Sequence, residues 1–175
     1  NYADRFFEKQ QLTSNSSSIW TPTYWLGNGM STPVITRYLF RWLIPIRYEM
    51  FFTIAFAILI SASFSYFLLR KFRLSALSSF FGAICYAFTP HFLTLIYPCH
   101  TDSIMQGAYT PMLFYFLTMA FDRNLMHASR KAVFLAMAGL SWGLVMNEDP
   151  QRGLYISILS VSYIAFRMLK ISNIE

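Results

Sequence analysis

The residues best able to do acid–base or phosphate chemistry fall in three separate segments of the sequence. A carboxylate can take a proton from a hydroxyl group, and a cation can hold a phosphate leaving group. Helix ends at a membrane surface and short turns also require polar residues, so a purely solvating role is an equally open interpretation. The set holds five of the eight acidic residues, with a histidine, a glutamine and an arginine beside them: Asp4, Glu8, Asp102, Glu148 and Asp149, with His100, Gln151 and Arg152.

The segment 99–102, with the sequence CHTD, combines a thiol, an imidazole and a carboxylate, which are all metal ligands. Nothing in the sequence fixes their geometry, and a structural turn is the simpler interpretation. Asp102 stands just before an apolar run, where a carboxylate caps the free amide groups of a helix. Glu148 allows the same interpretation, because Pro150 suits the first turn of a helix. The cofactor is therefore unknown from the sequence, and a divalent metal ion on Asp4 with Asp102 or His100 is an option that the spacing does not predict.

The composition indicates the environment that positions these residues. Of the 175 residues, 55% are hydrophobic, 19% are aromatic and only 13% are charged, whereas soluble domains carry roughly 25% charged residues. The net charge of +6 comes from 14 Lys and Arg against 8 Asp and Glu. Because the basic residues lie at the ends of apolar runs and not in one patch, no nucleic-acid partner is expected. These features exclude a disordered chain and predict an integral membrane protein with lipid as a partner.

Charge-free runs predict an all-α polytopic membrane fold with about five transmembrane helices. A span needs about 20 apolar residues, so the fourth and fifth runs are short and their flanking Arg and Lys are expected to reach the membrane interface. Pro90 is expected to interrupt the second run, because proline removes a backbone donor, and to orient His91 toward protein. The five runs are 50–69, 74–99, 103–121, 132–147 and 153–166.

The first 47 residues contain no run long enough to span. They are expected to form a folded outer-face loop, while 48–175 forms the transmembrane bundle. Within the loop, 34–46 mixes Arg37 and Arg41 with aromatic and apolar residues, which is typical of a helix lying at the interface. The chain begins without Met and ends just after an apolar run, so we expect a piece of a longer protein with further helices on both sides.

Basic residues also predict the orientation of the helices. Arg70, Arg123 and Arg167 each belong to a basic cluster that follows an apolar run, and such clusters mark cytoplasmic helix ends. Strict alternation then places the loops 1–47, 99–102 and 147–152 together on the outer side.

Small residues spaced four apart predict close contacts between helices. They form three stripes: Ser75, Ser79 and Ala83; Ser61 and Ser65; Gly139 and Gly143. Cys85 and Cys99 are too far apart along the chain for a disulfide, about 20 Å at helical rise, and are expected to be free thiols.

The order of these features resembles that of the YfhO-like bacterial membrane proteins, which look like members of the GT-C class of glycosyltransferases. The resemblance covers the chain from Asp4 to about Tyr155 and corresponds to the N-terminal part of a family member. The sequence departs from the family pattern by one inserted residue in the first motif, by Ser31 in place of a proline, by Cys99 in place of a glycine, and by Glu148 and Asp149 in place of Gly-His. The motifs that carry the resemblance are an acid near the start, WTPTY at 20–24, GNGM at 27–30, His100, and Pro150 with Gln151.

The resemblance implies that Asp4 is the catalytic base of a transfer from a polyprenyl-phosphate sugar donor. It implies an outer-face site in the bacterial cytoplasmic membrane. Arg152, with Arg5 or Arg37, suits the leaving phosphate by its charge. The expected substrate-binding residues are His100, Asp102, Gln151, Arg152 and Arg37.

Two other functions are compatible with the sequence. The chief alternative is a non-catalytic structural or accessory subunit of a larger membrane complex, in which the aromatic-rich loop 20–42 binds partner chains or lipid. A transporter is less favoured, because no charged residue lies in the middle of any predicted span, where coupling sites normally lie. The sequence contains no Gly-rich phosphate loop, nucleophile elbow or zinc-helix motif.

Overall fold

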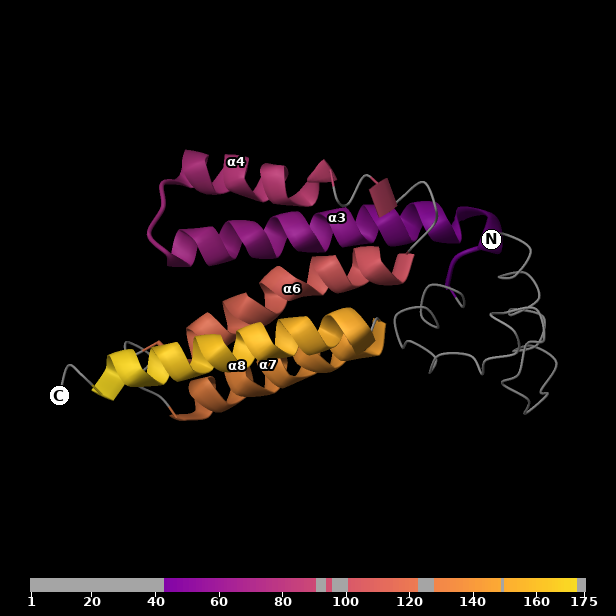
Figure 1. Cartoon of the computed structure of the whole chain (residues 1–175). Helices are drawn as coiled ribbons and strands as arrows, with labels where there is room; N and C mark the ends of the chain where they lie inside the picture. The colour runs from indigo at the N-terminus through magenta and orange to yellow at the C-terminus, as the bar shows by residue number, and fades with distance from the viewer. Residues whose placement is uncertain (1–42, 91–93, 96–100, 123–127, 149, 173–175) are drawn as a thin grey trace, which may run out of the picture. The chain divides into compact units, whose positions relative to one another are not determined.

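The computed structural model describes residues 43–90, 94–95, 101–122, 128–148 and 150–172. Over these residues the protein is all-helical and has no strand, which confirms the predicted fold class at this level. The chain divides into two units, Asn1–Thr53 and Ile54–Glu175, and the packing below is that of the second unit. The helices are α3 (Ile46–Lys71), α4 (Ala76–Ala87), α6 (Thr101–Ala120), α7 (Ala128–Glu148) and α8 (Pro150–Ser172) (Figure 1).

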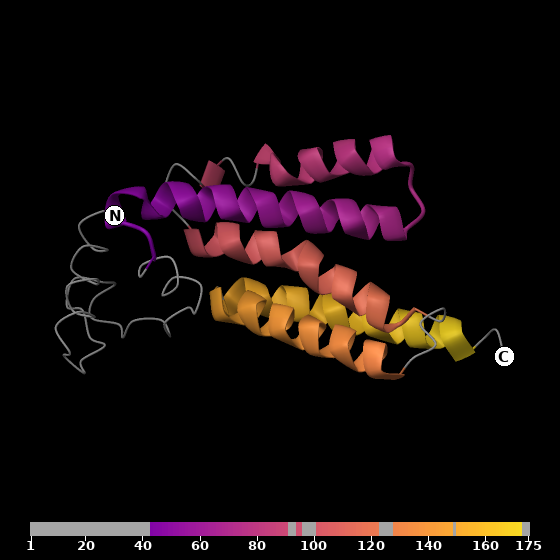
Figure 2. The ribbon, with the colours of Figure 1, turned by 180° about the vertical axis from the view of Figure 1, so that it is seen from behind.

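Helix α6 is the central helix of the second unit and lies between α3 and the pair α7 and α8 (Figures 1 and 2). Helix α4 contacts it through a hydrogen bond from the Tyr86 hydroxyl to the Gly107 carbonyl. Most of its residues from 104 to 120 are buried. The ring of Phe116 lies 5.5 Å from that of Phe64 in α3 and 6.3 Å from that of Phe134 in α7. Thr118 shares a hydrogen bond of 2.8 Å with the Tyr163 hydroxyl of α8. Aromatic packing and single side-chain hydrogen bonds therefore join α6 to its neighbours.

Helix α4 is short because a serine caps its first turn and a proline follows shortly after its last turn. The Ser75 side chain accepts a hydrogen bond from the Ser78 amide at 3.1 Å and caps the first turn. At the other end the amides of Phe88 and Thr89 turn back to carbonyls of the last turn. The helix ends before Pro90 because the residue ahead of a proline disfavours the helical conformation. The predicted interruption near Pro90 is confirmed, and His91 lies outside the described residues.

Helices α7 and α8 are longer than the sequence predicts. The expected ranges 132–147 and 153–166 are wrong at their ends, since α7 has 21 residues and α8 has 23. The charged residues that bounded the apolar runs, such as Arg130 and Arg167, lie inside the helices. Arg and Lys are good helix formers, so a charge ends an apolar run without ending a helix. At about 1.5 Å per residue, both helices reach the length needed to cross a bilayer.

One described helix meets the criteria of a membrane span by length and composition. It covers Phe51–Lys71, with 21 residues and a mean hydropathy of 2.1. Ala76–Ala87 is apolar but shorter. Five spans therefore remain a prediction.

The close helix contacts predicted from the small-residue stripes are confirmed in part. Ser61, Ser65, Ser79 and Ala83 are buried, as expected for close helix contacts, while Ser75 is the exposed cap of α4. Gly139 and Gly143 are exposed, and a methyl group added at either would meet no atom within 4 Å. Their predicted contact is therefore wrong for the described part of the chain, because α7 turns a different face to the core, with Ala138, Ser141 and Val145. Cys85 is a free, exposed thiol, as predicted.

Candidate functional site

Three helix ends meet at one end of the second unit. Helix α6 begins at Thr101, α7 runs back and ends at Glu148, and α8 begins at Pro150. Both opposed views show these three ends together (Figures 1 and 2). We call this region the polar end. The backbone of the predicted site residues Asp102, Gln151 and Arg152 lies here.

The other predicted site residues cannot be added to this group. Asp4, Arg37 and His100 lie outside the described residues. For Asp102 and Gln151 the structure describes the backbone, in the first turns of α6 and α8. Arg152 is exposed in the first turn of α8. A common cavity for these residues therefore stays a prediction.

Gln106 is a buried polar residue of the polar end that the sequence analysis did not single out. It is 2% exposed, and its Nε2 donates a hydrogen bond of 3.0 Å to the carbonyl of Val145. Val145 belongs to the last four residues of α7, whose carbonyls lack donors within the helix. Gln106 of α6 thus caps α7 and fixes the register between the two helices. A single carboxamide inside an apolar run was the available signal, because burying an amide is costly without a hydrogen bond.

Glu148 is buried at the end of α7, with 6% of its surface exposed. The sequence allowed a solvated role for the acids of this turn, and burial excludes that role for Glu148. It lies three residues beyond Val145 and therefore near the Gln106 cap. A buried carboxylate can accept a proton or bind a polar group of a substrate.

The start of α8 is held tightly against the end of α7. A methyl group added at Gly153 would lie 2.8 Å from the sulfur and 3.1 Å from the Cα of Met146. One turn further, Trp142 Nε1 donates to the Ser157 hydroxyl at 2.7 Å, and that hydroxyl donates to the carbonyl of Gly153 at 2.8 Å. These contacts set the position of the neighbouring residues Glu148 and Arg152.

A metal centre finds no support within the residues the structure describes. They include no group of three or more His, Cys, Asp or Glu that could hold a metal ion. The described part of the polar end holds a carboxylate in Glu148, a carboxamide in Gln106 and a guanidinium in Arg152.

Comparisons with protein-family models, with curated proteins and with solved structures found no match. The resemblance to the YfhO-like proteins, and the donor and outer-face site that it implies, therefore stay predictions from the sequence.

Proposed function

We propose that this chain is a multi-span helical bundle of a lipid bilayer that transfers a sugar from a polyprenyl-phosphate donor at its outer face. The observation that carries the membrane part is the outward direction of the large apolar side chains. Such a surface on α4, α7 and α8 suits lipid, and soluble monomers rarely expose large contiguous apolar patches. Members that are each more than half exposed include Leu77, Phe81, Val133, Leu140, Leu154, Ile158, Val161 and Phe166.

Small hydroxyl side chains are buried in the interior of the bundle. Ser61, Ser141 and Ser160 are completely buried, and each hydroxyl donates to a carbonyl of its own helix, at 2.7 to 3.1 Å. Polar groups must be satisfied internally where no water is present. Small hydroxyl residues among the buried apolar ones let helices pack closely in a bilayer, and large apolar residues on the outside suit lipid.

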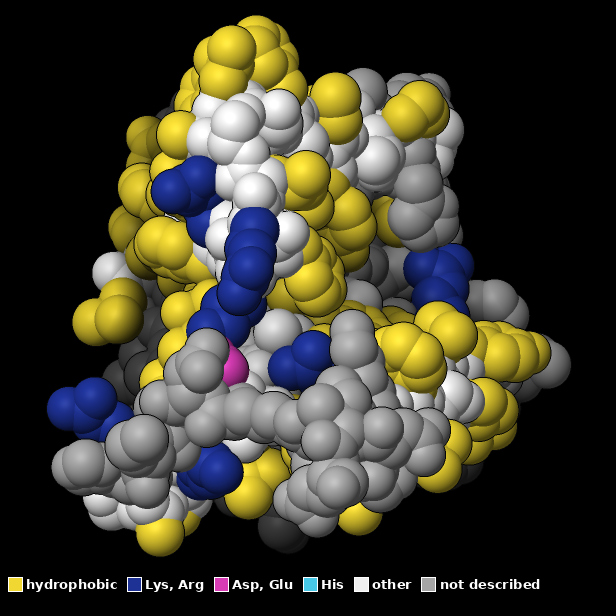
Figure 3. Space-filling model, turned by 90° about the vertical axis from the view of Figure 1, so that its left-hand side faces the viewer, with side chains coloured by type: hydrophobic (Ala, Val, Ile, Leu, Met, Phe, Trp, Pro, Cys, Tyr) yellow, Lys and Arg dark blue, Asp and Glu magenta, His cyan; other side chains and the backbone are white. Residues whose placement is uncertain are grey.

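The two ends of the bundle differ in charge, which supports the predicted orientation. The end opposite the polar end holds the end of α3, the end of α8 and the start of α7, and we call it the basic end. Figure 3 faces this end and shows Lys and Arg side chains gathered on it. The described basic residues here are Arg70, Lys71, Arg73, Arg130, Lys131 and Arg167. By the positive-inside rule the basic end is cytoplasmic and the polar end is on the outer side.

Transfer of a sugar needs a base for the acceptor hydroxyl and cations for the leaving phosphate. The resemblance assigns the base to Asp4. Arg152, exposed at the polar end, supplies a cation, and Glu148 supplies a buried carboxylate close in sequence. Of the groups that this reaction needs beside the base, the described part of the polar end supplies one cation, Arg152.

The experiment is a transfer assay with the full-length protein in proteoliposomes, using a radiolabelled hexose linked to polyprenyl phosphate. We expect Asp4→Asn to lower turnover by about 10²- to 10⁴-fold, the usual contribution of a positioned base. Glu8→Gln, which removes a neighbouring acid of the same segment, is the matched control and should retain turnover. Donor binding by Asp4→Asn should stay close to that of the unchanged protein.

Equal turnover of the Asp4→Asn variant and the unchanged protein would remove Asp4 as the base. No turnover by the unchanged protein, with an intact fold, would leave the alternative of a non-catalytic subunit of a larger membrane complex.

A further inference from the structure

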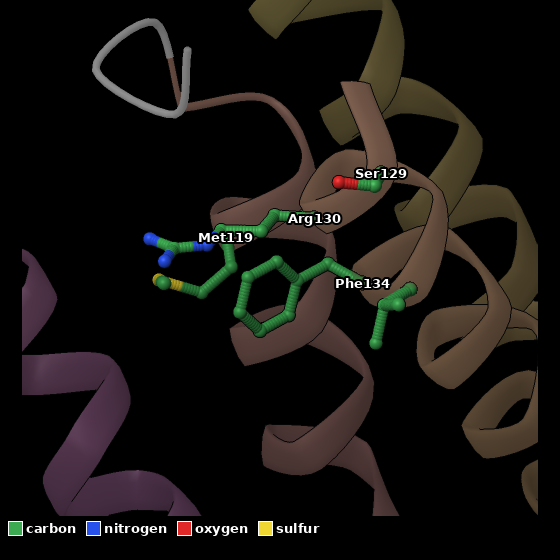
Figure 4. A pocket seen from close by; sticks show the side chains of 5 residues that line it. Met119, Ser129, Arg130 and Phe134 are labelled. Carbon is green, nitrogen blue, oxygen red and sulfur yellow. The ribbon is translucent and has the colours of Figure 1, made fainter. Parts of the chain in front are cut away.

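A pocket of about 490 Å³ lies at the basic end, between α6 and α7 (Figure 4). It is lined by Met119, Ser129, Arg130, Val133 and Phe134. Three of these side chains are apolar and form the walls. The ring of Phe134 is held by its contact with Phe116 of α6, at 6.3 Å between centroids. The apolar part of the pocket is therefore built on the core and does not depend on exposed side chains alone.

The polar part of the pocket is provided by the first turn of α7. Arg130 and Ser129 are both exposed, so the guanidinium and the hydroxyl are accessible. Figure 4 shows the chain of Arg130 running past Met119 above the Phe134 ring. A guanidinium binds two oxygens of a phosphate at once, and a hydroxyl can donate a further hydrogen bond.

The charges around the pocket favour an anion. Asp122, which follows α6, is the one acidic side chain that the structure describes at this end, and it forms an ion pair with Lys71. Arg167 of α8 donates to the Phe121 carbonyl at 3.3 Å. Because Asp122 neutralises Lys71, no described carboxylate at this end is left to neutralise Arg130, Lys131 and Arg167, and the net charge around the pocket is positive.

We propose that this pocket binds one anionic phospholipid. Arg130 and Ser129 bind the phosphate, and an acyl chain lies along Met119, Val133 and Phe134. An apolar pocket with cations at its rim matches a molecule that is anionic at one end and apolar beyond it, and basic pockets between helices at the cytoplasmic side bind such headgroups. The inference rests on the proposed position of the bundle in a membrane, and it is independent of the sugar transfer at the opposite end.

The test is a binding titration of the purified full-length protein in neutral detergent with short-chain fluorescent phosphatidylglycerol. We expect Arg130→Gln to weaken binding by about tenfold, as expected for loss of a charge-assisted, bidentate contact. Lys131→Gln removes the same charge from the next residue, which does not line the pocket, and should weaken binding by less than about twofold. Val133→Phe narrows the apolar part without changing charge and should also weaken binding. Circular dichroism checks that each variant keeps its helices.

Several results would overturn the proposal. Equal losses for Arg130→Gln and Lys131→Gln would show general attraction to a basic surface. Equal affinity for phosphatidylcholine would remove the anionic preference, and displacement by inorganic phosphate alone would indicate a site for a free anion. Unchanged binding by Val133→Phe would place the acyl chain elsewhere. Sugar transfer by a protein that does not bind phosphatidylglycerol would overturn this inference alone, whereas selective lipid binding without transfer would overturn only the proposed reaction.

Discussion

Pro111 lies in the interior of α6, where a proline usually costs about 3 kcal/mol. It has no amide hydrogen, so the carbonyl of Gly107, four residues earlier, lacks its helical donor. The hydroxyl of Tyr86 in α4 donates to this carbonyl at 2.9 Å. A neighbouring helix thus replaces the missing donor, which is how prolines are tolerated in helices away from water. The same hydrogen bond attaches α4 to the central helix.

We predict that Tyr86→Phe lowers the free energy of unfolding by about 1–2 kcal/mol, because it leaves the Gly107 carbonyl without its donor. In a Pro111→Ala background residue 111 can donate to that carbonyl, so the loss should fall below about 0.5 kcal/mol. Unfolding of the four proteins in mixed detergent micelles measures this double-mutant cycle. Equal losses in the two backgrounds would show that the tyrosine hydroxyl does not substitute for the proline.

At the scale of the elements, the junction of α7 and α8 is a close helix–helix contact. A single residue separates the end of α7 at Glu148 from the start of α8 at Pro150, so the two helices approach each other closely from the first turn. Gly153 makes this possible, because any side chain there would meet both the sulfur and the backbone of Met146. The Met146 side chain can move away from an added methyl group, but its Cα cannot, because it belongs to the backbone of α7.

We predict that Gly153→Ala lowers the free energy of unfolding by about 1–3 kcal/mol, as overpacking does in a closely packed contact. Gly139→Ala is the matched control in α7. There a methyl group meets nothing within 4 Å, and alanine is a better helix former by about 1 kcal/mol, so stability should be unchanged or higher. Thermal unfolding in detergent compares the two variants. A Gly153→Ala protein as stable as Gly139→Ala would contradict the close approach of α7 and α8.

The sequence was sufficient to predict that the helices exist, because long apolar runs have few other solutions. The run 103–121 matches α6 within two residues at each end. Helix ends were less predictable where Arg or Lys follows the run. The stripe of Gly139 and Gly143 was misjudged because a spacing of four defines a face but not the direction in which it points.

The candidate site could likewise be predicted only in part from the sequence. Alternation of the helices was enough to place Asp102, Gln151 and Arg152 at one end. The cap that Gln106 forms on Val145 depends on the register between α6 and α7, and the burial of Glu148 depends on where α7 ends beside α6. Neither the cap nor the burial can be deduced from the spacing of residues within one segment of the sequence. Both arise only when helices distant in sequence pack together.

At the scale of the second unit, the distribution of apolar side chains and the distribution of charge support the same conclusion. Large apolar side chains face outward while small hydroxyl side chains are among the buried residues, and the basic end is opposite the polar end. The proposed membrane position accounts for both, since the core of a bilayer covers apolar surface and its cytoplasmic face attracts Lys and Arg. The proposed lipid pocket and the proposed transfer site would then lie on opposite sides of the membrane.

We predict this arrangement for cysteine labelling of the full-length protein in intact cells, in a background with Cys85→Ser and Cys99→Ser. Arg152→Cys, exposed at the polar end, should react with an impermeant maleimide. Arg130→Cys, exposed at the basic end, should react only after the membrane is permeabilised. Leu159→Cys, on the outward apolar surface of α8 and 60% exposed in the structure, should react in neither case because lipid covers it. Exchange of the first two results would reverse the orientation, and labelling of Leu159→Cys in intact cells would contradict the membrane position of α8.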